Sequence, residues 1–452
     1  MLVPDPPLPA GRNGPGDGPG LPRPRGPGPP ATDDEQMTGD GQQMTDSAGP
    51  APGAAPPPTP ATPATGDFTP AERARGRALR RAQLPWALGG RLAGLALVLL
   101  LGLTPAGAAL VTAVGGWFGG SRTAEVLAGA AALVVLGQAV QLPFGAGVRT
   151  VRTRFGLVTQ GWGGWAVDAL RGLALGLVLA LPVALGLFAL TARSPRYWWI
   201  PAAGAAALLT AALSFLYPLL VEPVFNRFSP MPPGPLRTAL LGLAEQDGVR
   251  VRDVLVADAS RRTTALNAYV SGLGATRRIV VYDTLLATAE PREVELVVAH
   301  ELGHVKHRDV LTGTVLGAMG AAFVVAVLGL LADWEPLLSA AGATDAADPR
   351  ALPLLAACAA LLGALSGPVQ CAVSRKVEVR ADRHALELTS DAEQFIAMQR
   401  RLAVTNVSDV DPPRVLGLLF ATHPSATRRI AAARTWQASA PGPAADPGKS
   451  VV

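Results

Sequence analysis

The chain alternates between long stretches without charged side chains and shorter polar segments. A helix needs about 20 mostly apolar residues to cross the roughly 30 Å hydrocarbon layer of a membrane. Six windows that lack Asp, Glu, Lys and Arg reach this length, so the pattern predicts six membrane-spanning helices, with Pro105 and Pro182 kinking two of them. The windows are Leu92–Ser121, Val126–Val148, Gly172–Ala192, Tyr197–Val221, Val310–Ala332 and Ala351–Ser374.

Between the fourth and fifth windows the pattern changes to short apolar runs separated by turn residues. The runs Val251–Ala257, Leu266–Ser271 and Arg278–Tyr282 are typical of β-strands and predict a small antiparallel sheet. An extended peptide can pair with the edge of such a sheet as a further strand, because backbone hydrogen bonds make little demand on its sequence.

Composition agrees with a membrane protein and argues against a nucleic-acid-binding protein. Hydrophobic residues make up 49% of the chain and charged residues 16%, with a mean hydropathy of +0.30. The net charge is +5, but the basic residues are scattered around the apolar windows and do not gather on one soluble face. We therefore expect a lipid bilayer and no nucleic acid as a partner, and we attribute the excess of Arg, Ala, Gly and Pro to a GC-rich, bacterial genome.

The placement of charge predicts the orientation in the membrane, because positively charged loops stay in the cytoplasm. A cluster of arginines precedes the first window, and basic residues also follow the second and sixth windows, whereas the loop between the fifth and sixth is mainly acidic. Six spans then place the N-terminus and residues 223–309 on the cytoplasmic side of a plasma membrane. The basic residues used here are Arg73, Arg75, Arg77, Arg80, Arg81, Arg149, Arg152, Arg154, Arg375, Lys376 and Arg380.

The sequence His300-Glu-Leu-Gly-His304 predicts a zinc site. Pro291 is suited to a first helical turn, so the helix is expected to run from there to about Arg308. Two histidines four residues apart then share one face of that helix, and the glutamate after the first can take a proton from the attacking water. His307 lies off this face, and we expect no ligand role for it.

A catalytic zinc takes three protein ligands, so a third must come from elsewhere in the chain. Glu378 and Asp382 follow the last apolar window and share one helical face, so that one carboxylate can bind the metal while the other orients a ligand. An acidic pair at this spacing is also typical of a solvated helix face. Their position, where the chain returns to the side of the His300 helix, favours the metal-binding interpretation.

These motifs, taken together, resemble the M48 family of integral membrane zinc peptidases, and its CAAX prenyl protease (Ste24-type) branch in particular. The resemblance covers about residues 85–435 and includes several segments in the expected order. They are Glu222–Met231, Asn267-Ala268-Tyr269, Arg278–Asp283, His300–His304, Glu378-x-x-Ala-Asp382 and Thr422-His-Pro-Ser425 with Arg429.

The resemblance implies a membrane helical bundle with a gluzincin-like α+β peptidase domain, and a role for each matching residue. It implies one Zn²⁺ bound by His300, His304 and Glu378, with Glu301 as general base and Asp382 supporting a ligand. His423 and Arg429 would contact the substrate or the developing oxyanion. The substrate backbone would be held by Asn267, Ala268 and Tyr269. From the residues alone, Asn267 fits an ordinary turn position and His423 the start of a helix.

Domain boundaries follow from these patterns. Residues 1–70 and 437–452 are predicted to be disordered tails, because they are rich in Pro and Gly and poor in large apolar side chains. Four spans occupy 71–230 and two occupy 310–374, while 231–309 and 375–436 form the peptidase region. The eukaryotic members of the family have seven spans, so a seventh stays an open question.

The substrate is left open by the sequence. A peptide or protein is expected, either prenylated at a CAAX terminus or otherwise associated with the membrane. The second interpretation is cleavage of damaged membrane proteins, as in the HtpX-like branch of the same family. A membrane scaffold or transporter without catalytic activity is the alternative of a different class, but it would be expected to have lost Glu301 or Glu378.

Overall fold

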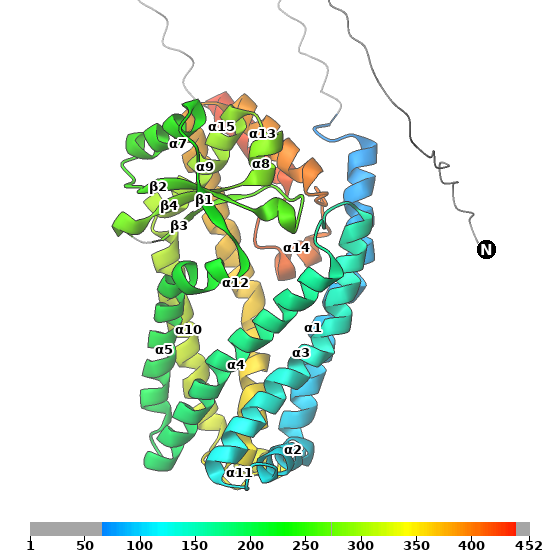
Figure 1. Cartoon of the computed structure of the whole chain (residues 1–452), viewed down its shortest axis with the longest axis vertical. Helices are drawn as coiled ribbons and strands as arrows, with labels where there is room; N and C mark the ends of the chain where they lie inside the picture. Colours follow the sequence, from blue (N-terminus) through cyan, green and yellow to red (C-terminus); the bar gives the residue numbers. More distant parts are fainter. Residues whose placement is uncertain (1–65, 273, 440–452) are drawn as a thin grey trace, which may run out of the picture. The chain divides into compact units, whose positions relative to one another are not determined.

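The computed structural model describes residues 66–272 and 274–439 (Figure 1). Of the predicted tails, 1–70 and 437–452, positions 1–65 and 440–452 lie outside these residues, whereas Pro70 already belongs to helix α1 and residues 437–439 to helix α15. The helices are α1 (Pro70–Leu103), α2 (Pro105–Gly116), α3 (Arg122–Arg154), α4 (Trp162–Arg193), α5 (Trp199–Leu216), α6 (Glu222–Phe225), α7 (Pro235–Gln246), α8 (Asp283–Thr288), α9 (Pro291–Lys306), α10 (Asp309–Leu331), α11 (Glu335–Ala340), α12 (Leu352–Thr389), α13 (Ala392–Thr405), α14 (Arg414–Phe420) and α15 (Ala426–Ser439). The strands are β1 (Phe228–Pro230), β2 (Asp253–Ala257), β3 (Ala268–Ser271) and β4 (Arg278–Tyr282).

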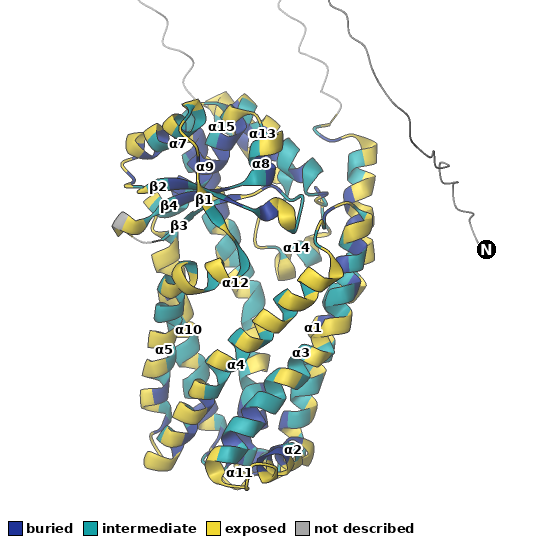
Figure 2. Ribbon diagram, in the orientation of Figure 1, coloured by how far each residue is buried: buried dark blue, intermediate teal, exposed yellow. Residues whose placement is uncertain are grey.

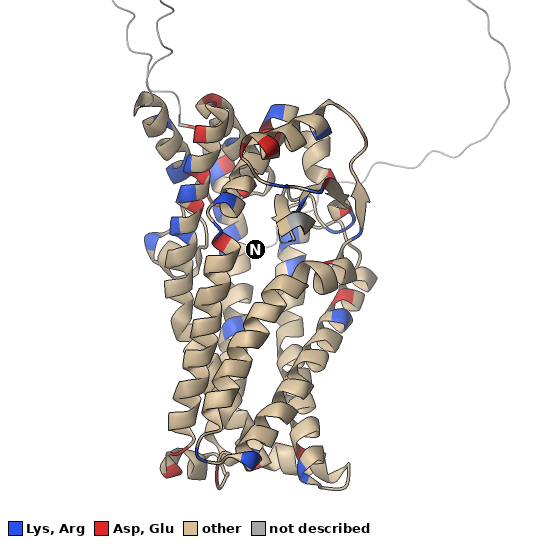
Figure 3. Cartoon of the chain, turned by 90° about the vertical axis from the view of Figure 1, so that its left-hand side faces the viewer, with Lys and Arg blue, Asp and Glu red and all other residues tan. Residues whose placement is uncertain are grey.

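Six helical segments of the described chain are long and apolar enough to cross a membrane, as the sequence predicts. They contain α1, α3, α4, α5, α10 and α12. Large apolar residues on them are exposed, and Leu208, Leu330 and Leu365 are 72%, 76% and 67% exposed. Figure 2 shows exposed and intermediate residues along most of the length of these helices. Charged residues gather toward the ends of these helices and are nearly absent from their middle portions (Figure 3). Such a surface is stable only in lipid, so the protein is an integral, multi-pass membrane protein.

The first predicted span is wrong in its detail. Leu92–Ser121 does not form one kinked helix, because α1 ends at Leu103 and the short helix α2 begins at Pro105. Thr104 between them is extended, with a ψ of 162°. The residue before a proline is disfavoured in the α conformation, and the Thr104 hydroxyl accepts a hydrogen bond from Ala106 N at 3.3 Å to cap α2. The span is instead completed on the N-terminal side, by α1 residues from Pro70 onward.

The sheet is mixed, so the prediction of an antiparallel sheet is wrong. The strand order is β1-β2-β4-β3, with β2 and β4 parallel and the other two pairs antiparallel. The sequence patterns located β2, β3 and β4 but not the three-residue β1. Alternation of apolar residues reports which side chains are buried and not the direction of the neighbouring strand, which explains the error. β3 forms one edge of the sheet.

The core of the peptidase region lies between this sheet and helices α7, α9 and α13. Leu240, Ile279, Leu296 and Phe395 from these elements are completely buried. Burying one such side chain contributes about 1.5–3 kcal/mol, so this cluster fixes α9 against the sheet. Figure 1 shows the sheet with α7, α9, α13 and α15 at one end of the long helices and α2 and α11 at the other.

Helix α9 begins where the sequence predicts and ends slightly earlier than predicted. Pro291 occupies its first turn, and Glu290 N donates to Glu293 Oε2 at 3.0 Å within a capping box. The helix ends at Lys306 because Arg308 adopts a left-handed conformation, with φ at 56°. This turn redirects the chain so that α10 begins at Asp309.

Helix α12 carries the sixth span and the acidic pair on one continuous element of 38 residues. It crosses α9 closely at Gly303, where an added Cβ would lie 3.1 Å from His384 Cβ and 3.3 Å from Ala381 Cα. A larger side chain at this position would push the two helices apart. The glycine of the His-Glu-Leu-Gly-His motif therefore brings Glu378 within reach of the two histidines.

Candidate metal centre

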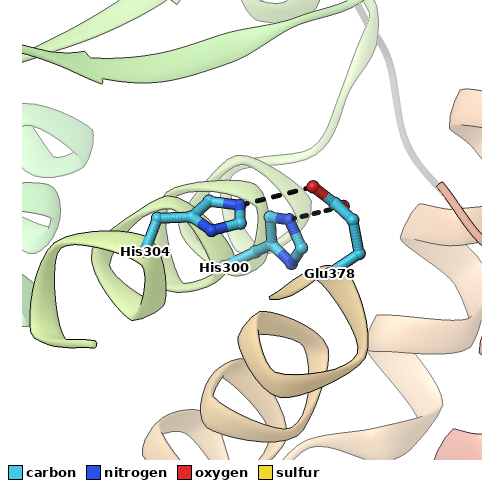
Figure 4. Close-up of side chains that lie close together, drawn as sticks. All are labelled: His300, His304 and Glu378. Carbon is cyan, nitrogen blue, oxygen red and sulfur yellow. Dashed lines mark ion pairs between the residues drawn. The ribbon is translucent and has the colours of Figure 1, made fainter. Parts of the chain in front are cut away.

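The two histidines of α9 and Glu378 of α12 converge on one point (Figure 4). One potential ligand atom from each of the three side chains lies within 4.8 Å of the others. His300 Nε2 is 3.4 Å from Glu378 Oε2, and His304 Nε2 is 3.6 Å from Glu378 Oε1. The structure therefore brings together the three residues that the sequence analysis singled out for zinc.

The second nitrogen of each imidazole contacts a different carboxylate. His300 Nδ1 is 2.9 Å from Asp382 Oδ1, and His304 Nδ1 is 3.0 Å from Asp309 Oδ2. A carboxylate only accepts hydrogen bonds, so each Nδ1 must carry the proton. In the neutral form of each imidazole, Nε2 then has a free lone pair facing Glu378. This is the tautomer that a metal bound through Nε2 requires.

The donor set and its spacing fit zinc. In a tetrahedral site with zinc–ligand distances of about 2.0–2.2 Å, neighbouring donor atoms lie about 3.3–3.6 Å apart. The observed separations of 3.4 and 3.6 Å, each to a different oxygen of Glu378, are close to that spacing and long for hydrogen bonds. Glu378 Oε2 is also buried without a hydrogen bond to any described residue. A buried carboxylate oxygen is costly in that state, and a shared cation would satisfy it.

The electrostatics around His300 favour a positive charge. Burial by itself lowers the pKa of this imidazole, but the neighbouring carboxylates of Asp382 and Glu378 outweigh it and raise the pKa to about 9. The same carboxylates would stabilise a divalent cation placed between the ligands.

Glu301 lies next to this group, on the wall of a cavity of about 430 Å³. Burial raises the pKa of its carboxyl above the ordinary value, while the imidazoles of His300 and His304 oppose the rise. No hydrogen bond or ion pair within the described chain holds its carboxylate. A partly desolvated carboxylate that is free to accept a proton is suited to general base catalysis.

His423 and Arg429 line the same cavity but are held differently. His423 Nε2 lies 3.3 Å from Glu378 Oε1, and its side chain is 59% exposed. Arg429 is nearly buried, donates from Nε to Asp382 Oδ2 at 2.7 Å, and makes a second contact through Nη2 to Asp382 Oδ1. Burial lowers and the Asp382 carboxylate raises the pKa of Arg429, with a net increase. Its guanidinium is therefore occupied by Asp382, whereas the imidazole of His423 is accessible from the cavity.

The three residues predicted to hold the substrate backbone have different surroundings. Asn267 is exposed on the cavity wall, immediately before edge strand β3. Ala268 is buried, and Tyr269 packs edge-on against Tyr282 at 6.3 Å, away from the cavity lining. Burial and the nearby Glu222 raise the pKa of Tyr269. Only Asn267 thus offers a side chain to the cavity, while Ala268 and Tyr269 lie on the edge strand itself.

Two residues of this region were missed by the sequence analysis. Asp309 supports His304, and Asn406 fixes the start of the edge strand by accepting from Leu266 N at 2.9 Å and donating to Leu266 O at 3.4 Å. Asp309 lies five residues after His304. Helical periodicity does not relate these two positions, because Arg308, in a left-handed conformation, separates α9 from α10. Asn406 is 140 positions from Leu266 in the sequence, so no local sequence pattern could predict their contact. A search for carboxylates just past the helix end could have found Asp309.

Comparison with known proteins assigns most of the chain to two matches. Residues 63–227 match the CAAX prenyl protease N-terminal domain, described as five membrane helices, and residues 233–437 match peptidase family M48. Helices α1–α5 lie within the first match, and four of them, α1, α3, α4 and α5, belong to segments long and apolar enough to span a membrane.

Individual relatives agree with this assignment. The chain is 31% identical over 281 residues to the uncharacterized metalloprotease YhfN of Bacillus subtilis, covering 61% of this chain and 65% of that protein, just under two thirds of its length. It is 27% identical over 311 residues to a CAAX prenyl protease 1 homolog of Caenorhabditis elegans, covering 63% and 70%.

A solved structure, that of Ste24p from S. mikatae, is similar in fold. It has a TM-score of 0.73 and 20% sequence identity, and the match covers 82% of this chain and 90% of that one. At this identity the similarity shows the shared fold, with its membrane helices and peptidase region. On the two family matches and these relatives, the chain belongs to peptidase family M48, a family of metalloproteases, and carries the membrane helices of the CAAX prenyl protease branch.

Proposed function

We propose that the protein is a zinc endopeptidase of the membrane, in which His300, His304 and Glu378 hold one Zn²⁺. The proposal is supported by the arrangement of the two imidazoles. Their Nε2 atoms lie 3.4 and 3.6 Å from the two oxygens of Glu378. Their Nδ1 atoms each contact a separate carboxylate, that of Asp382 for His300 and that of Asp309 for His304. A zinc ion bound there would lower the pKa of a bound water and polarise the scissile carbonyl.

The protein groups then perform the proton transfers and the positioning. Glu301 accepts a proton from the attacking water and passes it to the leaving amine. His423 donates a hydrogen bond to the oxyanion, since its imidazole is accessible from the cavity. Arg429 acts as a positioning residue, in place of the oxyanion contact expected from the sequence, because it holds Asp382 against His300. The extended substrate pairs with edge strand β3 beside Asn267.

The substrate class that we propose is a peptide segment of a protein attached to the membrane, cleaved in the manner of a CAAX prenyl protease. Support comes from the match of residues 63–227 to the N-terminal domain of that branch. It also comes from an apolar cavity of about 910 Å³ among the membrane helices, whose lining includes Leu133, Trp198 and Leu355. A cavity of this kind suits a lipid chain.

We also propose that the active site faces the cytoplasm. The support is the basic character of the segments at the peptidase end, including Arg77, Arg152 and Lys376, against the acidic loop that contains Asp333, Asp345 and Asp348. Protease digestion of the peptidase end in inverted vesicles, and its protection in right-side-out vesicles, would check this orientation.

Metal removal tests the function directly. The purified protein is expected to contain one zinc per chain and to cleave a membrane-anchored model peptide. Dialysis against a strong chelator should abolish cleavage, and stoichiometric zinc should restore it, because the three ligands cannot polarise a carbonyl by themselves. Full activity in a preparation shown by elemental analysis to lack metal would disprove the proposal.

Asp309 gives a more specific test, because it was identified only from the structure. Asp309→Asn keeps the shape of the side chain but weakens its hold on the His304 Nδ1–H. We expect zinc affinity to fall by about 10- to 100-fold, as measured by competition with a fluorescent chelator. Asp333→Asn, an exposed carboxylate at the far end of the spans, serves as the matched control. Equal zinc affinity in the two variants would rule out the supporting role.

A further inference from the structure

The edge strand β3 is held near both of its ends by segments that belong to the membrane-spanning helices or connect them. In the described sheet β3 pairs with β4 alone, so its second edge is left for an added peptide strand. The contacts near its ends come from the segment that leaves the span containing α5, and from α4 with the connection that precedes it. The position of this edge therefore depends on helices of the membrane region.

Glu222 holds the end of the strand. It begins α6, within the apolar segment Trp199–Phe225 that is long enough to span a membrane. Ser271 is the last residue of β3, and its Oγ donates to Glu222 Oε2 at 3.1 Å. The hydroxyl of Tyr269 donates to the same carboxylate. Hydrogen bonds to an ionised group are about twice as strong as those between neutral groups, so this carboxylate ties the strand to the end of the span.

The segment just before β3 is fixed to the connection between α3 and α4. Val158 and Thr263 form an isolated antiparallel β-bridge. The hydroxyl of Thr263 donates to Leu157 O at 2.9 Å, and that of Thr264 donates to Gly156 O at 2.9 Å. Two neighbouring threonines thus hold the approach to the strand against backbone carbonyls of the membrane region.

Arg262 adds a charged contact to this attachment. Its Nη2 lies 3.0 Å from Asp168 Oδ1 on α4, and its guanidinium lies 5.8 Å from the centre of the Phe225 ring. Arg261 Nη2 donates to Phe225 O at 3.2 Å. Phe225 is three residues after Glu222, so the attachments at the two ends of β3 converge on the same short helix, α6.

The place of the strand matters because of the geometry of strand addition. An edge strand has a neighbour on one side only, so pairing fixes less of it than of an inner strand. A peptide that joins it needs a strand spacing of about 4.8 Å and N–H···O distances of about 2.9 Å. A shift of β3 by about 1 Å would therefore lengthen several hydrogen bonds to the peptide beyond their working range.

We propose that Glu222 and Arg262 are positioning residues, through which the membrane helices hold β3 in the place where a peptide substrate pairs with it. This inference rests on the proposed peptidase function and deepens it. The membrane region then sets the affinity for the substrate backbone in addition to anchoring the enzyme. The zinc ligands and Glu301 lie on other elements, so the chemical step does not depend on these two residues.

Steady-state kinetics with an extended fluorogenic peptide tests the proposal. Glu222→Ala and Arg262→Ala should each raise KM by about 10-fold and leave kcat within about two-fold of the wild type, because they weaken binding of the backbone in ground and transition states alike. Glu222→Gln can still accept from Ser271, and Arg262→Lys can still pair with Asp168, so both should stay within about three-fold of the wild-type KM. Zinc content should stay at one per chain in all four.

Two substitutions at exposed positions serve as controls. Glu335→Ala removes a carboxylate from α11, at the opposite end of the long helices from the sheet (Figure 1). Arg383→Ala removes an arginine from α12. Both should keep the wild-type KM. Should Glu222→Ala or Arg262→Ala fail to fold, as judged by the melting temperature, Ser271→Ala and Thr264→Ala remove single hydroxyls from the same two attachments and are measured in their place.

Hydrogen exchange of the backbone amides of β3 reports on the strand without any substrate. These amides should exchange about 10-fold faster in Glu222→Ala than in the wild type, because the strand opens more easily when its end is released. An unchanged KM in the two alanine variants would overturn the proposal. So would a raised KM with unchanged exchange, since Glu222 would then contact the peptide directly, and so would a fall in kcat with loss of zinc, since the change would then have spread to the metal centre.

A binding measurement separates this inference from the proposed function. Fluorescence anisotropy of a labelled peptide on the Glu301→Gln protein needs no turnover. If the wild-type protein cleaves no peptide, the proposed function fails, yet weaker peptide binding in Glu222→Ala/Glu301→Gln than in Glu301→Gln would still support the positioning role. Equal affinity in the two would reject that role even in a fully active enzyme.

Discussion

Replacing Glu301 with glutamine is expected to lower kcat/KM for peptide hydrolysis by about 10²- to 10⁴-fold while zinc stays bound. The amide has the same shape as the carboxylate but cannot accept the proton of the attacking water. The proposed zinc ligands are unchanged, so metal content should stay near one per chain. Turnover of a fluorogenic peptide and elemental analysis on the same sample measure both quantities.

The control for this substitution is Glu245→Gln, an exposed glutamate on α7. The substitution makes the same chemical change at a residue that does not line the catalytic cavity, so activity should match the wild type. Normal turnover in Glu301→Gln would show that another group takes the proton. Loss of zinc from that variant would instead mean that Glu301 supports the metal and that its effect on rate is indirect.

The second large effect is expected for Glu378→Ala. This change removes the carboxylate that faces both Nε2 atoms and leaves two imidazoles as the remaining ligands. Zinc should be lost on dilution, and activity should fall on the order of 10³-fold, because the metal supplies several kcal/mol of transition-state stabilisation. Elemental analysis after gel filtration and peptide turnover give the two measurements.

Glu387→Ala is the matched control, since Glu387 lies on the same helix with half of its side chain exposed. Retention of zinc in Glu378→Ala would contradict the proposed ligand set. His423 is the residue to examine in that event, because its Nε2 lies 3.3 Å from Glu378 Oε1 and could reach the vacated position. A double variant, Glu378→Ala/His423→Ala, would then lose the metal.

These two variants also separate the proposed enzyme from the scaffold or transporter considered at the outset. A scaffold would tolerate both substitutions, because neither glutamate would have a chemical role. The CAAX protease and quality-control interpretations predict the same loss of turnover, so they are distinguished by substrate.

Much of the fold could be predicted from the sequence, because the signals are local. Charge-free windows predict spans directly, since a charged side chain in lipid is costly wherever it occurs. The His300 helix was predicted from Pro291, which favours the first turn of a helix. Errors occurred where two segments had to be related: the direction of β2 against β4, and the break at Thr104 that makes α2 a separate helix.

For the metal centre, the sequence by itself determined which groups can bind a metal and accept a proton: two imidazoles on one helical face, with a glutamate beside the first. Only the tertiary structure decided which carboxylates meet them. Glu378 reaches the histidines because α12 crosses α9 at Gly303, and Asp309 reaches His304 because the chain reverses at Arg308. A cavity beside the metal centre, lined by arginines of α1, α12, α14 and α15, likewise depends on these four helices meeting in space. Contacts of this kind depend on packing between segments far apart in the sequence, and the periodicity of side chains along one helix or strand does not predict that packing.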